Sequence, residues 1–137
     1  MRTRPGTALA EWAIVDRGGF ADLRLGDERD VIRKRFGEFR SFRRTADAPE
    51  SDQFMPSGLM VTYGDDQCVT CVEVPRPAAN PTLRGVPLVG RAIGEVAADL
   101  AVNGIDVQPD STGAVIVDWG VGLYAPYGVV EAVSIGA

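Results

Sequence analysis

Histidine is absent from this 137-residue sequence, and its absence excludes histidine-based catalytic triads, histidine-ligated metal sites and histidine general bases. No stretch approaches the roughly 20 consecutive apolar residues of a membrane-spanning helix, so the sequence predicts no contact with the membrane interior. The apolar residues near the N-terminus are interrupted by Glu11, Asp16 and Arg17, which argues against a secretory signal peptide. We therefore expect a cytoplasmic protein.

Cysteine is scarce, since the sequence contains only Cys68 and Cys71. They lie in a β-branched run that predicts a strand, whereas a thioredoxin-type C-x-x-C motif places its first cysteine at the N-terminus of a helix. Residues three apart on a strand point to opposite faces, so a disulfide between them would distort the strand. A zinc site needs four ligands, and no second cysteine or histidine pair exists. We interpret both as small buried residues in a reducing cytoplasm, and we expect no metal or other cofactor.

Lysine appears once, at Lys34, and the other thirteen basic residues are arginine; nineteen acidic residues leave a net charge of −5. The segment from Arg29 to Arg44 holds seven basic and two acidic residues, a local net of +5, which leaves −10 for the rest of the chain. This segment predicts either a solvated basic helix face or a site for anions or nucleic acid. The alternative site would consist of Arg33, Arg35, Arg40, Arg43 and Arg44. An acidic protein repels phosphate backbones, so nucleic acid is disfavoured and a basic protein partner is favoured.

The first half of the chain predicts one helix and several antiparallel strands. Asp27 is placed to cap a helix that ends at Gly37. The polar, proline-containing stretch 45–53 is predicted to be a loop. Strands are predicted over residues 12–15, 20–25, 39–43, 58–63 and 67–74, the last two joined as a hairpin.

The second half repeats this order after the proline-rich stretch 75–81. An extended segment over 83–89 precedes a helix over 91–103, whose apolar residues recur at helical spacing. Strands are predicted over 105–107, 114–118, 120–124 and 129–135, with a turn over 109–113. Tyr63 matches Tyr124 at a spacing of 61, and Val31 matches Val96 at a spacing of 65. We interpret the halves as a tandem duplication, the alternative being two unrelated halves of similar composition.

These elements predict an α+β fold with two helices packed on one face of a seven- or eight-stranded, mostly antiparallel sheet. The other face is then open to solvent or to a partner. The predicted organisation is a flexible N-terminus (1–10), a first α+β unit (11–75), a linker (76–82) and a second α+β unit (83–137), with one core shared by both units.

A helix that begins after Leu-Gly and leads into an antiparallel meander, twice over, resembles the tandem-repeat β-lactamase-inhibitor proteins and the related small outer-membrane-assembly lipoprotein fold. The likeness is carried by Leu25, Gly26 and Val31 in the first unit and by Gly90 and Val96 in the second. The chain is also similar to immunity proteins that neutralise polymorphic toxins. The resemblance covers residues 19–137 and implies a non-enzymatic binder that uses its open sheet face.

The sequence contains no group of residues typical of a catalytic centre. Asp65 and Asp66 are ordinary hairpin-turn residues, and the glycine pairs lack the following helix and lysine of a phosphate-binding loop. The aspartates of the second unit do not have the spacing of a calcium loop. We therefore predict that the protein is not an enzyme.

The second unit combines aromatic and acidic residues in a way that favours protein binding. Tyrosine and tryptophan anchor interfaces because they bury a large area with few rotamers, and carboxylates attract a basic partner. The predicted partner-binding residues are Asp106, Asp110, Asp118, Trp119, Tyr124 and Tyr127. The alternative for Trp119 and Tyr124 is a place in the core. We predict an immunity-type inhibitor that occludes a basic toxin enzyme, with a self-associating structural module, a homo-oligomer, as the alternative.

Overall fold

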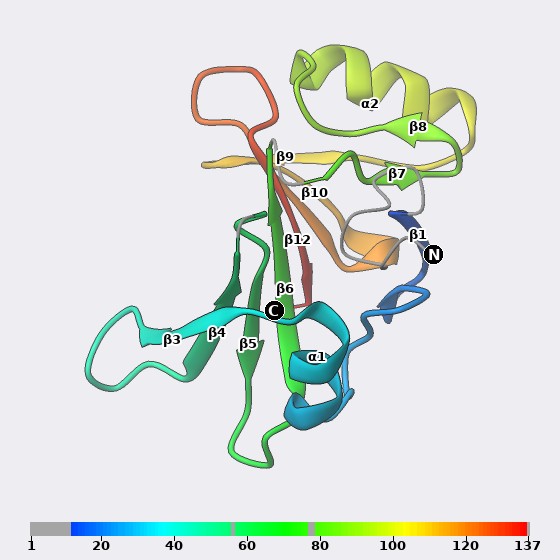
Figure 1. The fold of residues 1–137 in the computed structure, drawn as a ribbon. Helices are drawn as coiled ribbons and strands as arrows, with labels where there is room; N and C mark the ends of the chain where they lie inside the picture. Colours follow the sequence, from blue (N-terminus) through cyan, green and yellow to red (C-terminus); the bar gives the residue numbers. More distant parts are fainter. Residues whose placement is uncertain (1–11, 56, 77–78, 137) are drawn as a thin grey trace.

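The computed structural model describes residues 12–55, 57–76 and 79–136, and the same series of elements occurs twice within them (Figure 1). Each series is a short β-hairpin, one helix and a four-stranded meander. The first consists of β1 (Ala13–Asp16), β2 (Gly19–Phe20), α1 (Arg29–Phe36), β3 (Phe39–Arg43), β4 (Glu50–Phe54), β5 (Met60–Tyr63) and β6 (Val69–Pro75). The second consists of β7 (Thr82–Leu83), β8 (Val86–Pro87), α2 (Ile93–Val102), β9 (Gln108–Asp110), β10 (Gly113–Ile116), the 3-10 helix η3 (Val117–Trp119), β11 (Val121–Tyr124) and β12 (Ala132–Gly136).

The two meanders join into one eight-stranded antiparallel sheet with the strand order β3-β4-β5-β6-β12-β11-β10-β9. They meet where β6 pairs with β12, and the register there is symmetric. The pair Glu73–Ser134 lies at the centre, flanked by Val72–Ile135 and Val74–Val133. Adding 61 to a residue number in β6 gives the equivalent residue in β12, so Val72 corresponds to Val133, Glu73 to Ser134 and Val74 to Ile135. The two flanking pairs are therefore equivalent to each other, and the two members of the central pair are equivalent to each other. The large antiparallel sheet and the two helices confirm the predicted α+β fold class.

The segment that leads into each helix is attached to the segment at or just before the last strand of its own unit by the same three backbone hydrogen bonds. The N–H donors and C=O acceptors are Gly26 to Val69, Val69 to Asp27 and Arg29 to Gln67 in the first unit, and Gly90 to Val130, Val130 to Arg91 and Ile93 to Gly128 in the second. Arg29 is therefore equivalent to Ile93, and the fully buried Ile32 to Val96, at a spacing of 64. The predicted match of Val31 with Val96 is wrong by one residue, since Val31 is 40% exposed. Neither described helix is long and apolar enough to cross a membrane.

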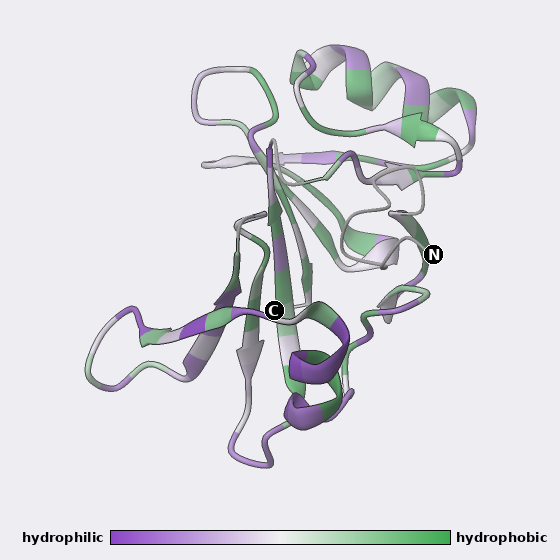
Figure 2. Ribbon diagram, viewed as in Figure 1, coloured by the Kyte–Doolittle hydropathy of each residue, from purple (hydrophilic) through white to green (hydrophobic). Residues whose placement is uncertain are grey.

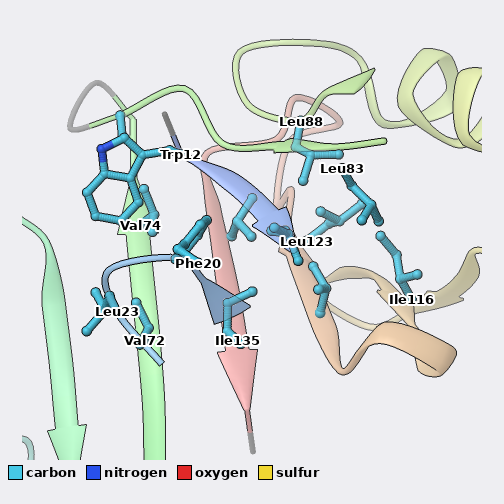
Figure 3. Close-up of a cluster of buried hydrophobic side chains, with 14 of the residues drawn as sticks. Trp12, Phe20, Leu23, Val72, Val74, Leu83, Leu88, Ile116, Leu123 and Ile135 are labelled. Carbon is cyan, nitrogen blue, oxygen red and sulfur yellow. The ribbon is translucent and has the colours of Figure 1, made fainter. Parts of the chain in front are cut away.

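A second, smaller sheet that the sequence did not predict joins the two hairpins, with the order β2-β1-β7-β8 and β1 parallel to β7. Its side chains pack on one face of the large sheet. Trp12, Phe20 and Leu83 contribute to a cluster with Val72, Leu123 and Ile135 of the large sheet (Figure 3). Buried side chains of both helices belong to the same cluster. The two units therefore share one core.

The strand registers make Tyr63 and Tyr124 inequivalent, although the sequence spacing matches them. Met60 and Gly122 face the equivalent residues Glu73 and Ser134, so β5 matches β11 at an offset of 62 positions, and not 61. Tyr124 is thus equivalent to Thr62, and Tyr63 to Ala125. Tyr63 is buried in the core, while Tyr124 is 50% exposed on the opposite face of the sheet.

Several local predictions are wrong. The predicted loop 45–53 contains most of β4. The predicted strand 20–25 is only β2, because a turn follows it and the Asp27 carboxylate accepts a hydrogen bond from the N–H of Arg24 at 2.9 Å. Glu28, not Asp27, is therefore the N-cap of α1.

In the second unit, residues 105–107 form no strand, and β9 instead occupies part of the predicted turn 109–113. The predicted flexible N-terminus (1–10) and residues 77–78 of the predicted linker lie outside the described residues.

Replacement of Gly113 by alanine tests the backbone geometry at the start of β10. Gly113 has φ +153°, and a Cβ atom there would lie 2.1 Å from the carbonyl oxygen of Leu123. Because this neighbour is backbone, we expect Gly113→Ala to lower the free energy of unfolding by about 3 kcal/mol. The matched control is Gly94→Ala in α2, where nothing lies within 4 Å of the new methyl group and helix propensity favours alanine by up to about 1 kcal/mol. Urea unfolding of both variants measures the difference, and equal stabilities would contradict it.

Candidate functional site

The face of the large sheet opposite the core is largely open, and Arg17, Gly18 and Leu25 are the residues from outside the sheet that line its concave part. One register row on this face crosses all eight strands, through Arg40, Gln53, Met60, Glu73, Ser134, Gly122, Val115 and Gln108. The six inner members of the row are half-buried and the two outermost are exposed. This face is therefore open, with a shallow, mostly uncharged centre.

The open face is hollowed over the second unit, in a concavity of about 1060 Å³ that we call the sheet hollow. Its floor is made of small residues, Gly122, Ala132 and Ser134, and Tyr124 stands at its rim. A Cβ atom on Gly122 would lie 2.5 Å from the Ser134 hydroxyl, so the floor is low because glycine occupies that position. The hollow thus offers a partner a recessed surface beside an exposed aromatic ring.

Over the first unit, the same face is covered in part by one long side chain. The Arg44 guanidinium forms an ion pair with Glu73 and reaches the Met60 sulfur at 4.0 Å. The residue equivalent to Glu73 in the second unit is Ser134, which has no charge to hold an arginine. Most of the residues that line the hollow therefore come from the second unit, while Arg17, Gly18, Leu25, Arg44, Met60 and Glu73 come from the first.

The structure brings together only two of the six predicted partner-binding residues, since Tyr124 and Asp110 both line the sheet hollow. Tyr127 is 91% exposed in the loop between β11 and β12. Asp118 is exposed on η3, and Asp106 is exposed before β9. Trp119, also on η3, is half-buried against the core, with the Arg84 guanidinium 5.4 Å from its ring centroid. The predicted set therefore does not form one surface.

The five arginines of the predicted anion site also diverge. Arg35 donates to the carbonyl oxygen of Asp22, and Arg43 donates to that of Ala48, both at 2.6 Å. Arg44 pairs with Glu73 on the open face, and Arg40 is exposed on β3. Arg33 points into the molecule. The basic segment therefore contributes to several separate environments and presents no single cationic cluster.

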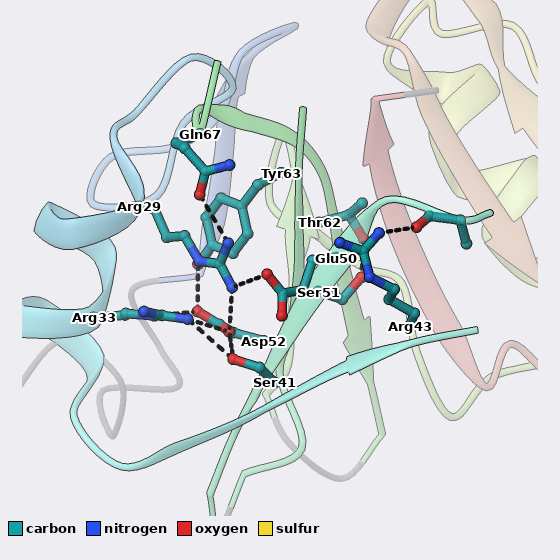
Figure 4. A network of polar contacts seen from close by, with 11 residues as sticks. Arg29, Arg33, Ser41, Arg43, Glu50, Ser51, Asp52, Thr62, Tyr63 and Gln67 are labelled. Atoms are coloured by element: carbon teal, nitrogen blue, oxygen red, sulfur yellow. Dashed lines mark hydrogen bonds and ion pairs between the residues drawn. The ribbon is translucent and has the colours of Figure 1, made fainter. Parts of the chain in front are cut away.

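Arg33 belongs to a network of charged side chains between α1, β3 and β4 (Figure 4). Its guanidinium makes two parallel hydrogen bonds to the fully buried Asp52 carboxylate, at 2.7 and 3.0 Å. Ser41 donates to the same carboxylate at 2.7 Å and accepts from Arg33 at 3.0 Å. Tyr63 donates to it at 3.1 Å. Asp52 is therefore the acceptor that connects one helix with three strands.

Arg29, which is 8% exposed, completes this network from the first turn of α1. Its guanidinium lies 2.9 Å from the Glu50 carboxylate and 3.4 Å from that of Asp52. It donates to the Gln67 side chain at 2.9 Å and lies 4.7 Å from the Tyr63 ring centroid. Gln67 holds this position with φ +64°, a conformation that costs a residue with a side chain about 1 kcal/mol or more. A polar cleft of about 640 Å³ opens beside the two arginines, and carboxylates surround it.

The second unit builds the same fold without any of these polar groups. By the register and helix matches given above, the equivalents of Arg29, Arg33, Asp52, Tyr63 and Gln67 are Ile93, Ala97, Ala114, Ala125 and Gly128. The difference is visible in the helices, since α1 is largely hydrophilic and α2 carries more apolar residues (Figure 2). The fold itself therefore does not require the charged network, which is a property of the first unit alone.

The network holds Asp52 and Tyr63 each in one protonation state near neutral pH. Burial by itself raises the pKa of the Asp52 carboxyl, but the hydrogen bonds from Arg33, Ser41 and Tyr63 outweigh it and hold this pKa below its ordinary value. Burial and the adjacent Asp52 charge raise the pKa of Tyr63 well above its ordinary value. Neither group exchanges a proton near neutral pH, so the network orders the structure and is unsuited to acid–base chemistry.

The two cysteines are half-buried free thiols rather than fully buried residues. Burial raises the pKa of the Cys71 thiol to about 11, so it stays protonated at neutral pH and is a poor nucleophile. Within the described ranges, no group of three or more His, Cys, Asp or Glu side chains is arranged to hold a metal ion.

The sequence does not reveal this network, because its central residue, Asp52, lies in the predicted loop 45–53. A strand is recognised by apolar residues at alternate positions, and in β4 the inward position is occupied by Asp52. The spacing of Arg29 and Arg33, one helical turn apart, does indicate that both arginines lie on the same face of the helix. The partner of these arginines is not indicated, because no local pattern marks a buried aspartate.

Comparison with protein-family models, with characterised proteins and with solved structures finds no match to this chain. Its function is therefore inferred from its own geometry.

Replacement of Asp52 by asparagine tests the network. The substitution leaves two largely buried arginines without their shared carboxylate, and breaking a buried ion pair costs about 3–5 kcal/mol. We expect Asp52→Asn to lower the free energy of unfolding by about that amount in urea at neutral pH. The control is Asp65→Asn, an exposed change in the β5–β6 turn that we expect to leave stability within about 0.5 kcal/mol. A similar small effect for both would show that the network adds nothing to stability.

The depressed pKa of Asp52 also predicts a pH dependence. A carboxyl whose pKa is lower in the folded than in the unfolded state stabilises the fold fully above its unfolded value, near 4, and loses this contribution as the pH falls through the folded value. The difference in unfolding free energy between the wild type and Asp52→Asn should therefore shrink as the pH falls below about 4. Urea titrations at several pH values measure it, and a constant difference would refute this linkage.

Proposed function

We propose that the protein is a non-enzymatic binding protein, an immunity-type inhibitor that occludes a basic protein partner. The observation that supports this proposal is the sheet hollow, a concavity of about 1060 Å³ on the face of the large sheet opposite the core. Recessed surfaces with an aromatic residue at the rim are suited to receive a projecting segment of another protein. Tyr124 is such a rim residue, and Asp110 lies beside it.

Charge supports a basic partner. The second unit, which forms most of the hollow, has six acidic residues and two arginines between residues 83 and 137, a net of −4. Within the hollow the charges balance, because Arg17 and Arg44 line it together with Glu73 and Asp110. The acidic surroundings would speed the encounter with a basic protein, while contact in the hollow would be largely uncharged. Occlusion of this kind needs no chemical step.

A cytoplasmic site of action is part of the proposal and agrees with two cysteines that form no disulfide. The binding of nucleic acid through the arginines of the first unit is less well supported, because their side chains lie in different environments. A non-enzymatic role agrees with the fixed protonation of Asp52 and Tyr63.

The test is affinity capture with the full chain and two variants that add the same side chain at different places. Ala132→Trp fills the floor of the sheet hollow, and Val102→Trp adds the same bulk on α2, where Val102 is 86% exposed. Each variant is first checked for folding by circular dichroism. We expect the wild type and Val102→Trp to capture the same basic protein from a lysate of the source cells, and Ala132→Trp to capture at least about tenfold less. Where that protein is an enzyme, the wild type should inhibit it.

Capture should weaken as salt is raised, because part of the attraction is electrostatic. Equal capture by both tryptophan variants would show that the partner binds elsewhere. A stable homo-oligomer of the purified chain, dissociated by Ala132→Trp, would instead support the self-associating module.

A further inference from the structure

The edge strand β3 has unused backbone hydrogen-bonding groups on its outer side. It ends the eight-stranded sheet, and no described strand pairs with it beyond β4. The N–H of Met55 donates to the carbonyl of Glu38, and bonded pairs alternate along an antiparallel ladder. By this alternation, Arg40 and Phe42 bond to β4, while the N–H and C=O groups of Phe39, Ser41 and Arg43 point away from the sheet.

The opposite edge of the same sheet is closed by its sequence. Strand β9 has only three residues, Gln108–Asp110, and its central residue is Pro109. The ladder registers make Pro109 the equivalent of Ser41, because Pro109 faces Ala114 as Ser41 faces Asp52. Proline has no N–H to offer at this outward position, which blocks the addition of a further strand. The two edges therefore differ at the position that decides whether another strand can add.

The charged network holds β3 in place from the core side. The Ser41 hydroxyl is hydrogen-bonded to both Asp52 and Arg33, and the Arg33 guanidinium lies 4.0 Å from the ring centroid of Phe39. A strand fixed in this way loses little conformational entropy when a further strand binds to it. The β3–β4 hairpin also extends away from the rest of the fold, so its outer edge is accessible (Figure 1).

The side chains of β3 select the charge of an added strand. Arg40 and Arg43 lie on the strand and Arg44 follows it, with no acidic residue from Phe39 to Arg44. Glu50, which faces Arg43 from β4, is paired with Arg29. Antiparallel pairing of β3 with a second copy of itself would bring arginines together, which is unfavourable. An acidic strand would place carboxylates beside Arg40 and Arg43 instead.

We propose that β3 binds an extended, acidic segment of a partner protein, which adds to the sheet as a ninth strand. Backbone hydrogen bonds to Phe39, Ser41 and Arg43 would supply the affinity, and the arginines the preference for acidic sequence. This site lies at the far edge of the sheet from β9–β11 and does not depend on the function proposed for the sheet hollow.

The experiment uses a phage-displayed library of random twelve-residue peptides selected on the full chain. The selected peptides are then synthesised, and their binding is measured by fluorescence anisotropy against the wild type, Arg43→Ala and Arg43→Pro. Both variants lose the side chain of Arg43, but only Arg43→Pro also loses the outward N–H. We expect net acidic peptides without proline, bound at least about tenfold more weakly by Arg43→Pro than by Arg43→Ala.

Two further measurements keep the test independent of folding defects in Arg43→Pro. Arg40→Glu retains every backbone donor and should weaken the selected peptides, and more so at low salt. In the wild type, the amides of Phe39, Ser41 and Arg43 should become protected from hydrogen exchange when peptide is bound. The absence of any enriched peptide, enrichment without an acidic bias, or protection that maps to the sheet hollow would overturn the proposal.

Discussion

The pairing of β6 with β12 is the contact on which the rest of the fold depends. Each unit has a meander of four strands and one helix, and repeats of this kind bury their apolar faces by packing together. Joining them edge to edge places Val72, Val74, Val133 and Ile135 side by side beneath the small sheet, all fully buried. The symmetric register around Glu73 and Ser134 also sets the geometry of the open face. The sheet hollow lies beside this junction because Ser134, and not a second glutamate, stands in the second unit.

The two units show how one backbone arrangement supports two kinds of interior. In the second unit the equivalent positions are occupied by Ile93, Ala97 and Ala114, and Gly128 takes the position of positive φ before β12. In the first unit these positions hold a carboxylate, two guanidinium groups and a phenol. Buried ion pairs are seldom more stabilising than apolar packing of similar volume. Structural specificity explains the presence of the charged network better than stability does, because the hydrogen bonds of Asp52 fix one orientation of β3 against α1.

Much of the architecture could be predicted from the sequence, and the failures have definite causes. Helix α2 and strands β5, β6, β11 and β12 were predicted because their apolar residues recur at the helical or strand period. Strand β4 was missed because Asp52 takes the place of an apolar residue at its inward position. The small sheet was missed because strands of two residues are too short to show a period. Of the candidate site, Tyr124 and Asp110 were predicted, but the glycine and serine of the hollow floor carry no pattern that marks them.

Pro109 also bears on how the molecule behaves at high concentration. A sheet whose two edges both accept a further strand can grow without limit, because each added copy presents a free edge to the next, as in fibrous deposits. Here one edge lacks the donor that such growth needs, and the other carries like charges that repel an identical neighbour. Any attachment at this other edge is therefore terminal: it yields a finite complex of fixed stoichiometry, and open-ended growth stops after a single step.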